Sequence, residues 1–419
     1  LTGMTDMVVE TLNTPVEQRT AEQRQELLEY FRTIDPQLIK LKAQELAHRK
    51  KAPRDPAETT KAQVVDHLKV PRKTHLLVRG DFLNPADEVK ANTPAVLPPI
   101  GTSNPDRLDL ARWLFDPRQP LTARVTVNRI WSRYFGRGIV FTVNDFGTQG
   151  EPPSHPELLD WLATQFRKND WSLKQLHKLI VTSATYRQSS TNRPELEERD
   201  PYNTWLSHQN RLRVEAEIIR DQALTVSGLL KHKVGGPSVN PPQPEGIANL
   251  GYANSVKWTT SNGDDRYRRG LYTFFQRTVP YPMLMTFDSP DSNLSCTRRE
   301  RSNTPLQALT IWNDPVFFEC SQKLGTSIVE STQINNPSLD DRINYAFELC
   351  LARQPSEQEI HIIRQLYQEQ TKLLQSDQTA VSELTNQIQI PEGSTPREVA
   401  TWIMIGRVLM NLDEFVTRG

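Results

Sequence analysis

A helix-start pattern, in which Ser or Thr is followed three residues later by Glu or Gln, recurs along the 419-residue chain. The hydroxyl oxygen accepts a hydrogen bond from the third backbone N–H of the helix, and the Glu or Gln side chain accepts one from the N–H of the capping residue. The pattern occurs at Thr20–Gln23, Ser154–Glu157, Ser172–Gln175, Thr304–Gln307, Ser356–Glu359 and Thr395–Glu398. We therefore expect a mainly α fold, a multi-helix body with a minor β component and long irregular segments.

Residues 61–105 lack this helical pattern. Thr74–Arg79 has the composition of a strand, and Gly80 with Asp81 predicts a turn after it. Several prolines between positions 85 and 99 exclude a regular helix beyond that turn. We expect this part to be an extended linker or arm that wraps the main body.

A second irregular segment runs from Pro237 to Arg301, where Pro and Gly are frequent. Within it, Gly270–Thr278 has strand composition. The residues before it, Leu212–Leu230, predict a long amphipathic helix. A long irregular segment inside a helical body often serves binding or docking, and the alternative is plain connecting structure.

These changes of composition divide the chain into three parts. Residues 1–60 are predicted to be an N-terminal helical segment, the tail of a preceding domain, which ends in a charged linker from Arg49 to Thr60. Residues 61–105 are the linker or arm, and residues 106–419 are a helical domain with an irregular insertion at about 237–301. Because Leu1 is not an initiator Met, we expect a processed fragment of a longer precursor.

Composition limits the classes of function. The 50 Lys and Arg residues balance the 50 Asp and Glu residues, so the chain has no net positive charge to attract nucleic acid. No apolar run approaches the roughly 20 residues of a membrane span. The chain has no C-x-x-C-H, C-x-x-C or H-E-x-x-H motif, so we expect no haem, no metal site and no other cofactor in it. Cys296, Cys320 and Cys350 are too few for a disulfide framework and leave one bridge open.

Several stretches carry a resemblance to a known family. They are Leu121–Trp131, Tyr134–Gly138, Asp145–Trp161, Ser183–Gln188, Asp265–Gly270, Arg298–Ala308, Asn313–Pro315 and Arg407–Phe415. Over roughly residues 105 to 419 the chain resembles the planctomycete-specific domain of unknown function, of the PSD1 type. That domain is the C-terminal module of planctomycete proteins that often carry a cytochrome c domain.

The resemblance implies an exported protein, periplasmic or in the cell envelope or outside the cell, encoded near polysaccharide-degrading enzymes. It also implies two kinds of partner, another part of the same precursor or a c-type cytochrome, and any haem would lie on these. The family has no established activity, so the resemblance assigns no catalytic residues.

Arginines are the leading candidates for ligand binding. Arg129 and Arg133 repeat at four-residue spacing along one helix face, and Arg137 continues the row. Two further groups flank the irregular segment: Arg266, Arg268 and Arg269, then Arg298, Arg299 and Arg301. Guanidinium groups hold sulfate or carboxylate in a bidentate manner, so an anionic glycan is a candidate ligand. The alternative is that they pair with the interleaved carboxylates and pin loops.

Four carboxylates and one histidine are the weaker, catalytic candidates. Two carboxylates roughly 5–9.5 Å apart cleave a glycosidic bond when one of them has a raised pKa. The candidate carboxylates are Asp264, Asp265, Asp288 and Asp291. His155 at a helix start has the chemistry for proton transfer, and local packing is the alternative.

Aromatic residues divide by context. Trp131, Trp161, Trp171 and Trp205 fall in helical patterns and are predicted to be core residues. Trp258 and Tyr252, in the irregular segment, are candidates for stacking on a sugar ring.

Three functions stay open. The leading hypothesis is a noncatalytic scaffold or a docking and ligand-binding module, associated with a cytochrome c partner or with polysaccharide degradation. The alternatives are a carbohydrate-active enzyme on sulfated or uronic glycans and a structural component of the cell envelope.

Overall fold

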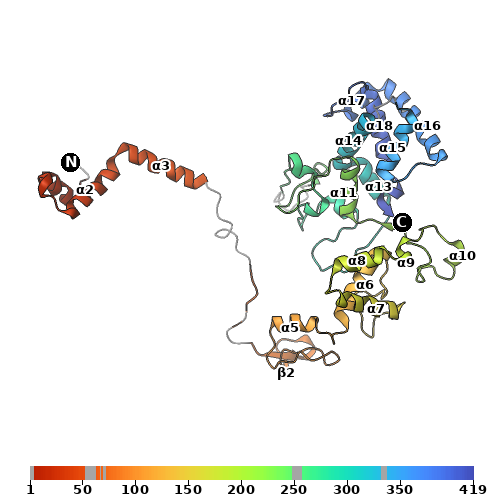
Figure 1. The fold of residues 1–419 in the computed structure, drawn as a ribbon, viewed down its shortest axis with the longest axis horizontal. Coiled ribbons are helices and arrows are strands. Elements are labelled where there is room, and N and C mark those ends of the chain that lie inside the picture. Colours follow the sequence, from red (N-terminus) through yellow and green to blue (C-terminus); the bar gives the residue numbers. More distant parts are fainter. Residues whose placement is uncertain (1–3, 52–62, 67, 69–71, 248–256, 332–336) are drawn as a thin grey trace. The chain divides into compact units, whose positions relative to one another are not determined.

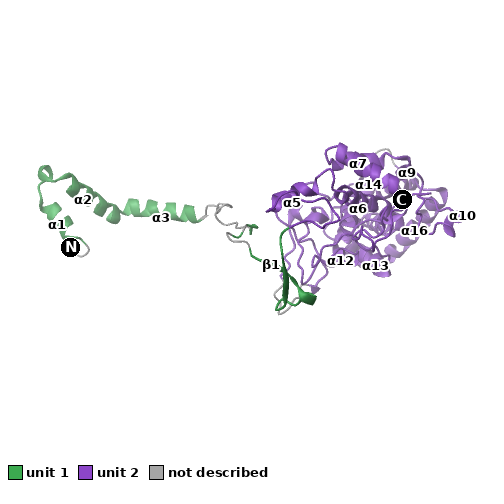
Figure 2. Cartoon of the chain, turned by 90° about the horizontal axis from the view of Figure 1, so that it is seen from below, with its two compact units in different colours: residues 1–91 green, residues 92–419 purple. Residues whose placement is uncertain are grey.

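The computed structural model describes residues 4–51, 63–66, 68, 72–247, 257–331 and 337–419. The chain divides into two compact units, Leu1–Ala91 and Asn92–Gly419, which Figure 2 distinguishes by colour. Helices account for 53% of the chain and strands for 4%, which confirms the predicted mainly α fold.

The first unit holds three helices, two 3-10 turns and a β-hairpin within its described residues. Its elements are α1 (Asp6–Asn13), η1 (Val16–Gln18), α2 (Ala21–Ile34), α3 (Pro36–Lys51), β1 (Thr74–Leu77), η2 (Val78–Gly80) and β2 (Pro85–Val89). The capping box at Thr20 is confirmed, because its hydroxyl accepts from Gln23 N while the Gln23 side chain accepts from Thr20 N. The predicted strand at Thr74 is confirmed, and it pairs antiparallel with β2. Strand β2 was not predicted, because its segment begins with a proline. Most of the predicted linker, residues 52–60, lies outside the described residues.

The second unit begins with a helical layer built around α6. Its first elements are α5 (Arg107–Leu114), α6 (Leu121–Phe135), α7 (Pro156–Lys168), α8 (Leu173–Val181), α9 (Ala184–Arg187) and α10 (Pro194–Glu197). Val127, Trp131 and Phe135 of α6 are buried against the apolar faces of α7 and α8. The buried Asn128 donates to Val140 O (2.9 Å) and accepts from Val140 N (2.8 Å), which fastens the turn after α6.

The rest of the second unit is a short strand and a helix, then the irregular segment, and then the helices that form a bundle with that first helix (Figure 1). Its elements are β3 (Leu212–Arg213), α11 (Ala216–Val226), η5 (Gly263–Tyr267), η6 (Gly270–Tyr272), α12 (Pro282–Thr286), α13 (Pro305–Asn313), α14 (Pro315–Ser331), α15 (Leu339–Leu351), α16 (Glu357–Ser376), α17 (Gln378–Leu384), α18 (Pro396–Met410), α19 (Asp413–Val416) and β4 (Thr417–Arg418).

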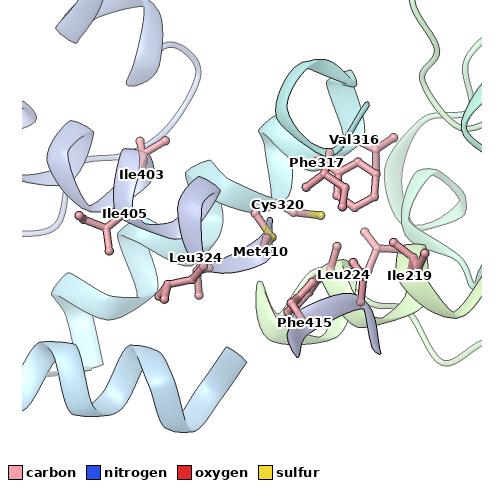
Figure 3. Packing of buried hydrophobic residues seen from close by; sticks show 14 of the residues in the cluster. Ile219, Leu224, Val316, Phe317, Cys320, Leu324, Ile403, Ile405, Met410 and Phe415 are labelled. Atoms are coloured by element: carbon pink, nitrogen blue, oxygen red, sulfur yellow. The ribbon is translucent and has the colours of Figure 1, made fainter. Parts of the chain in front are cut away.

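The core of this bundle lies where α11, α14, α18 and α19 meet (Figure 3). Ile219 and Leu224 of α11 and Phe317 and Leu324 of α14 are essentially fully buried there. Gly325 allows α14 to approach α18, because a Cβ at this position would lie 2.6 Å from the backbone nitrogen of Ile403. Burial of apolar surface therefore fixes the positions of these helices.

One predicted strand and one predicted cap are wrong, and one predicted helix is shorter than expected. Gly270–Thr278 is a 3-10 turn followed by irregular chain, with a single bridge from Thr273 to Val239. The helix predicted over Leu212–Leu230 extends only from Ala216 to Val226, because Leu212–Arg213 pairs with Thr417–Arg418 instead. The Ser154 capping box does not form, because the Ser154 hydroxyl donates to Ile139 O (3.2 Å) and His155 becomes the N-cap.

The capping prediction is confirmed at other helix starts. Thr304 and Ser356 form complete boxes. Ser172 and Thr395 cap their helices through the hydroxyl oxygen.

The tryptophan prediction is partly wrong. Trp131 is buried and Trp171 packs against the same cluster. Trp161 is 49% exposed and Trp205 is 55% exposed, so neither is a core residue.

Candidate functional site

In the predicted group of Arg266, Arg268 and Arg269, two arginines form ion pairs within the fold. Arg266 pairs with Glu319 of α14, and Arg269 Nε donates to Asp221 of α11 (2.7 Å). Asp221 also accepts from Gly270 N at 2.6 Å. These contacts fasten the irregular segment to the bundle.

Arg268 is the most buried member of this group, with 1% of its surface exposed. Its guanidinium donates to the backbone carbonyls of Lys233, Gly235 and Pro237. It also lies over the Tyr272 ring, 3.7 Å from the ring centroid. Arg268 therefore supplies backbone carbonyls with the donors that a strand would give, so its terminal nitrogens are used within the fold.

Arg299 and Arg301 of the other flanking group belong to an arginine cluster. We define this cluster as Arg133, Arg299, Arg301 and Arg418 around Glu215 and Glu217. Arg133 pairs with Glu215 at 2.6 Å. Arg299 donates to both carboxylate oxygens of Glu217, at 2.7 and 3.1 Å, and lies 3.3 Å from Glu215. Arg418 donates to the carbonyls of Arg133 and Tyr134 at the end of α6.

Arg301 is the exposed member of the cluster without a hydrogen bond or ion pair to any residue that the structure describes. Glu215, Arg418, Arg133 and Arg299 are near enough to act on its charge. Desolvation lowers the pKa of Arg301, and the three neighbouring guanidiniums lower it further against the opposing effect of Glu215. The cluster thus holds four guanidiniums and two carboxylates, and Arg301 is the member that forms no hydrogen bond or ion pair with the described residues.

A hydrogen-bonded clamp at Asp288 holds the chain next to Arg301. Ser302 donates to Asp288 from its backbone nitrogen (2.8 Å) and from its hydroxyl (2.8 and 3.0 Å). Gln307 donates to Ser302 Oγ at 3.0 Å and to Thr286 O at 3.0 Å. Asp288 has a φ of +62°, a conformation that non-glycine residues adopt at a cost and that the clamp maintains. The clamp therefore fixes the backbone next to Arg301. It also uses the carboxylate of Asp288, a predicted catalytic residue, as a hydrogen-bond acceptor.

The remaining catalytic candidates each have a partner of their own. Asp265 pairs with Lys233 (3.0 Å) and Asp264 pairs with Lys231 (3.2 Å). Asp291 accepts from Asn293, and these hydrogen bonds lower its pKa. His155 Nδ1 lies 3.0 Å from the hydroxyl of Ser154.

The other predicted ligand residues are dispersed. Arg129 is exposed and makes no hydrogen bond or ion pair within the described part of the chain. Arg298 lies 3.6 Å from Glu300 and over the Phe141 ring. Trp258 stacks on Tyr281 with ring centroids 5.7 Å apart and donates to Pro241 O, so it belongs to the packing of the segment.

Two further predictions concern aromatic stacking and cysteine. Tyr252 lies outside the described residues. All three cysteines are free, Cys296 exposed and Cys320 buried.

Metal and membrane features are both absent from the residues that the structure describes. These residues contain no group of three or more His, Cys, Asp or Glu side chains placed to hold a metal ion. None of their helices is both long enough and apolar enough to cross a membrane.

Comparison with known families accounts for most of the second unit. The model of PSD1, described as "Protein of unknown function (DUF1553)", matches residues 106–367. The chain belongs to the PSD1 family. No curated protein and no solved structure matches the chain. A restriction of this family to planctomycetes stays a prediction.

The PSD1 match includes three arginines of the cluster and both of its glutamates, and Arg418 lies beyond the match. Sequence reasoning missed Glu215, Glu217 and Arg418. Glu217 in the first turn of α11 is a usual helix-start feature and gave no sign of a site. Arg418 reaches α6 only because a strand of two residues pairs across the fold.

Proposed function

We propose that the PSD1 domain of this chain is a noncatalytic ligand-binding module whose ligand is an anionic glycan, sulfated or uronic. The observation that carries this proposal is Arg301, an exposed cation in a cluster of four arginines and two glutamates, which forms no hydrogen bond or ion pair with any residue in the described part of the chain. An arginine at such a position binds sulfate or carboxylate through two parallel N–H donors.

Binding is favoured over bond cleavage by the state of the candidate carboxylates. A glycosidase needs a general acid whose pKa is raised. Asp291 has a lowered pKa, and Asp288 accepts hydrogen bonds from Ser302. Asp264 and Asp265 are held by lysines.

The proposed setting follows the resemblance. An exported domain, in the periplasm or cell envelope, would hold a glycan for another part of the same precursor or for a c-type cytochrome partner. Haem would belong to that partner.

The test is a binding measurement on the full chain by isothermal titration calorimetry. The probes are a sulfated galactan, a polyuronate and a neutral glucan, at low and high salt. Arg301→Gln removes the proposed contact, and Arg277→Gln makes the same charge change at another exposed arginine that has no partner among the described residues.

We expect at least one anionic glycan to bind, and its affinity to fall roughly tenfold or more in Arg301→Gln because a charge-assisted pair is lost. Arg277→Gln should leave the affinity unchanged. Equal losses in both variants, or no binding of either anionic glycan, would contradict the proposal.

A second function, docking of a protein partner, is favoured by apolar residues close to Arg301 in the chain. Helix α13 begins at Pro305, four residues after Arg301, and exposes Leu306 and Leu309 at 61% and 55%. Leu294 in the preceding loop is 84% exposed. Retention of a second subunit after purification from the source, lost in Leu306→Ser and kept in Arg301→Gln, would favour docking over glycan binding.

A further inference from the structure

A groove of about 530 Å³ lies within the helical bundle, apart from the arginine cluster. Its lining comes from α14, α16, α17 and α18 and is chiefly apolar: Phe318, Leu373, Leu374, Ala380, Leu384 and Met404. Such a volume and lining are typical of sites for small organic ligands. The groove therefore has room for a molecule with an apolar body.

Arg407 of α18 forms one side of this groove. Its guanidinium lies 4.4 Å from the centroid of the Trp312 ring and 5.7 Å from that of Phe318. One terminal nitrogen donates to Trp312 O, and the other lies 3.8 Å from the thioether sulfur of Met404. Nε is buried and has no acceptor.

No carboxylate of the described residues lies within 4 Å of Arg407, which sets it apart from its neighbours in the bundle. Arg342 pairs with Glu398, and Arg364 pairs with Asp340. Desolvation lowers the pKa of Arg407, and no nearby charge opposes that effect. A half-buried cation without a counter-ion is costly, so an anion that entered the groove would be stabilised there.

Two carboxylates do line the groove, and they limit where an anion fits. Asp377 accepts from Ala380 N at 2.9 Å as the cap of α17, and Glu383 is exposed. Both disfavour a negative charge beside them, and Arg407 is the one cation among the lining residues. A bound anionic group would therefore be stabilised at Arg407, and the apolar walls are left for an uncharged tail.

We propose that this groove binds a medium-chain alkyl carboxylate, with its carboxylate on Arg407 and its alkyl chain along Leu373, Leu374 and Leu384. The thioether of Met404 is a weak acceptor, and the carboxylate would replace it at the terminal nitrogen of Arg407. This site is independent of the glycan site at Arg301.

The test is calorimetric titration of the full chain with decanoate. Decanol lacks the charge, acetate lacks the chain, and decyltrimethylammonium reverses the charge. We expect decanoate to bind, decanol to bind roughly tenfold more weakly, and the other two not to bind.

Two variants separate the roles of head and tail. Arg407→Met removes the cation, and Ala380→Phe fills the groove and leaves Arg407 in place. Each should weaken decanoate binding roughly tenfold or more, with the circular dichroism spectrum of the folded chain retained. If Arg407→Met fails to fold, the proposal is still tested by Ala380→Phe and by the ratio of the affinities for decanoate and decanol.

Decanoate binding that survives in both variants, decanol binding as tight as decanoate, or no decanoate binding to the natural sequence would overturn the proposal. Arg301→Gln serves as the control that keeps decanoate binding. A failure of the glycan proposal therefore leaves this result unaffected.

Discussion

The helical bundle and the irregular segment of the second unit are held together by different forces. In the bundle, α14 and α18 pack through fully buried residues such as Leu324 and Ile403, and most charged groups stay at the surface. In the irregular segment, Arg268 is buried and donates to three backbone carbonyls. Regular helices satisfy their own backbone groups, whereas irregular chain needs side chains to do so. The buried arginine of this segment is thus structural, whereas Arg301, at its end, belongs to a cluster of charged residues and forms no hydrogen bond or ion pair with the described residues.

The largest expected effect is the loss of Arg268. Arg268→Met leaves the carbonyls of Lys233, Gly235 and Pro237 without their donor, and we expect the free energy of unfolding to fall by roughly 3–5 kcal/mol. Urea denaturation measures this. Arg277→Met, at an exposed arginine, is the matched control and should change stability by less than about 0.5 kcal/mol. Equal free energies of unfolding in the two variants would contradict the claim that Arg268 holds the irregular segment together.

Asp314, between α13 and α14, is one of the charged residues buried in the bundle, a carboxyl with only 4% of its surface exposed. Burial raises its pKa from 3.8 to about 6, against the donor of Val316 and the charge of Arg220, while Glu319 raises it further. The folded state therefore holds this proton more tightly than the unfolded chain does. Its contribution to stability is present near pH 4 and is lost as the pH rises through about 6.

Asp314→Asn should remove this pH dependence. Relative to the natural sequence, the variant is expected to gain roughly 2–3 kcal/mol between pH 4 and pH 7.5. Urea unfolding of both chains across this range isolates Asp314 from the other carboxyls. A stability difference that does not change with pH would show that Asp314 titrates normally.

The smallest expected effect is at a surface ion pair of the bundle. Arg353 donates to Glu359 and to Glu414, which are 33% and 43% exposed. Glu414→Gln should cost about 0.5 kcal/mol, and less at high salt, because solvent screens such pairs. If Glu414→Gln lowered the free energy of unfolding as much as Arg268→Met does, the bundle would depend on ion pairs as strongly as the irregular segment does, which would contradict the comparison.

Helix starts could be predicted from the sequence because they depend on residues three apart. Thr304 and Ser356 cap their helices as expected. The prediction failed at Ser154, where the carbonyl of Ile139 competes for the hydroxyl. It also failed at Leu212, whose partner strand lies two hundred residues later in the chain.

For the candidate site, the sequence predicted the type of residue, arginine, but not which arginine would lack a partner. Arg298, Arg299 and Arg301 were identified from the sequence, but nothing local distinguishes Arg299 from Arg301. The difference depends on Glu215 and Glu217, which the fold brings from α11 and its N-cap. Which cation lacks a partner is thus a property of tertiary structure.

The most direct measurement compares Arg299→Gln with Arg301→Gln, two residues apart in the same cluster. Thermal unfolding and affinity for a sulfated galactan would be measured side by side. Arg299→Gln should lower the unfolding midpoint, because Glu217 loses both of its donors. Arg301→Gln should leave the midpoint unchanged or higher and lower the affinity roughly tenfold. The reverse pattern, in which Arg301→Gln destabilises the chain and keeps its affinity, would contradict the division between structural and available arginines.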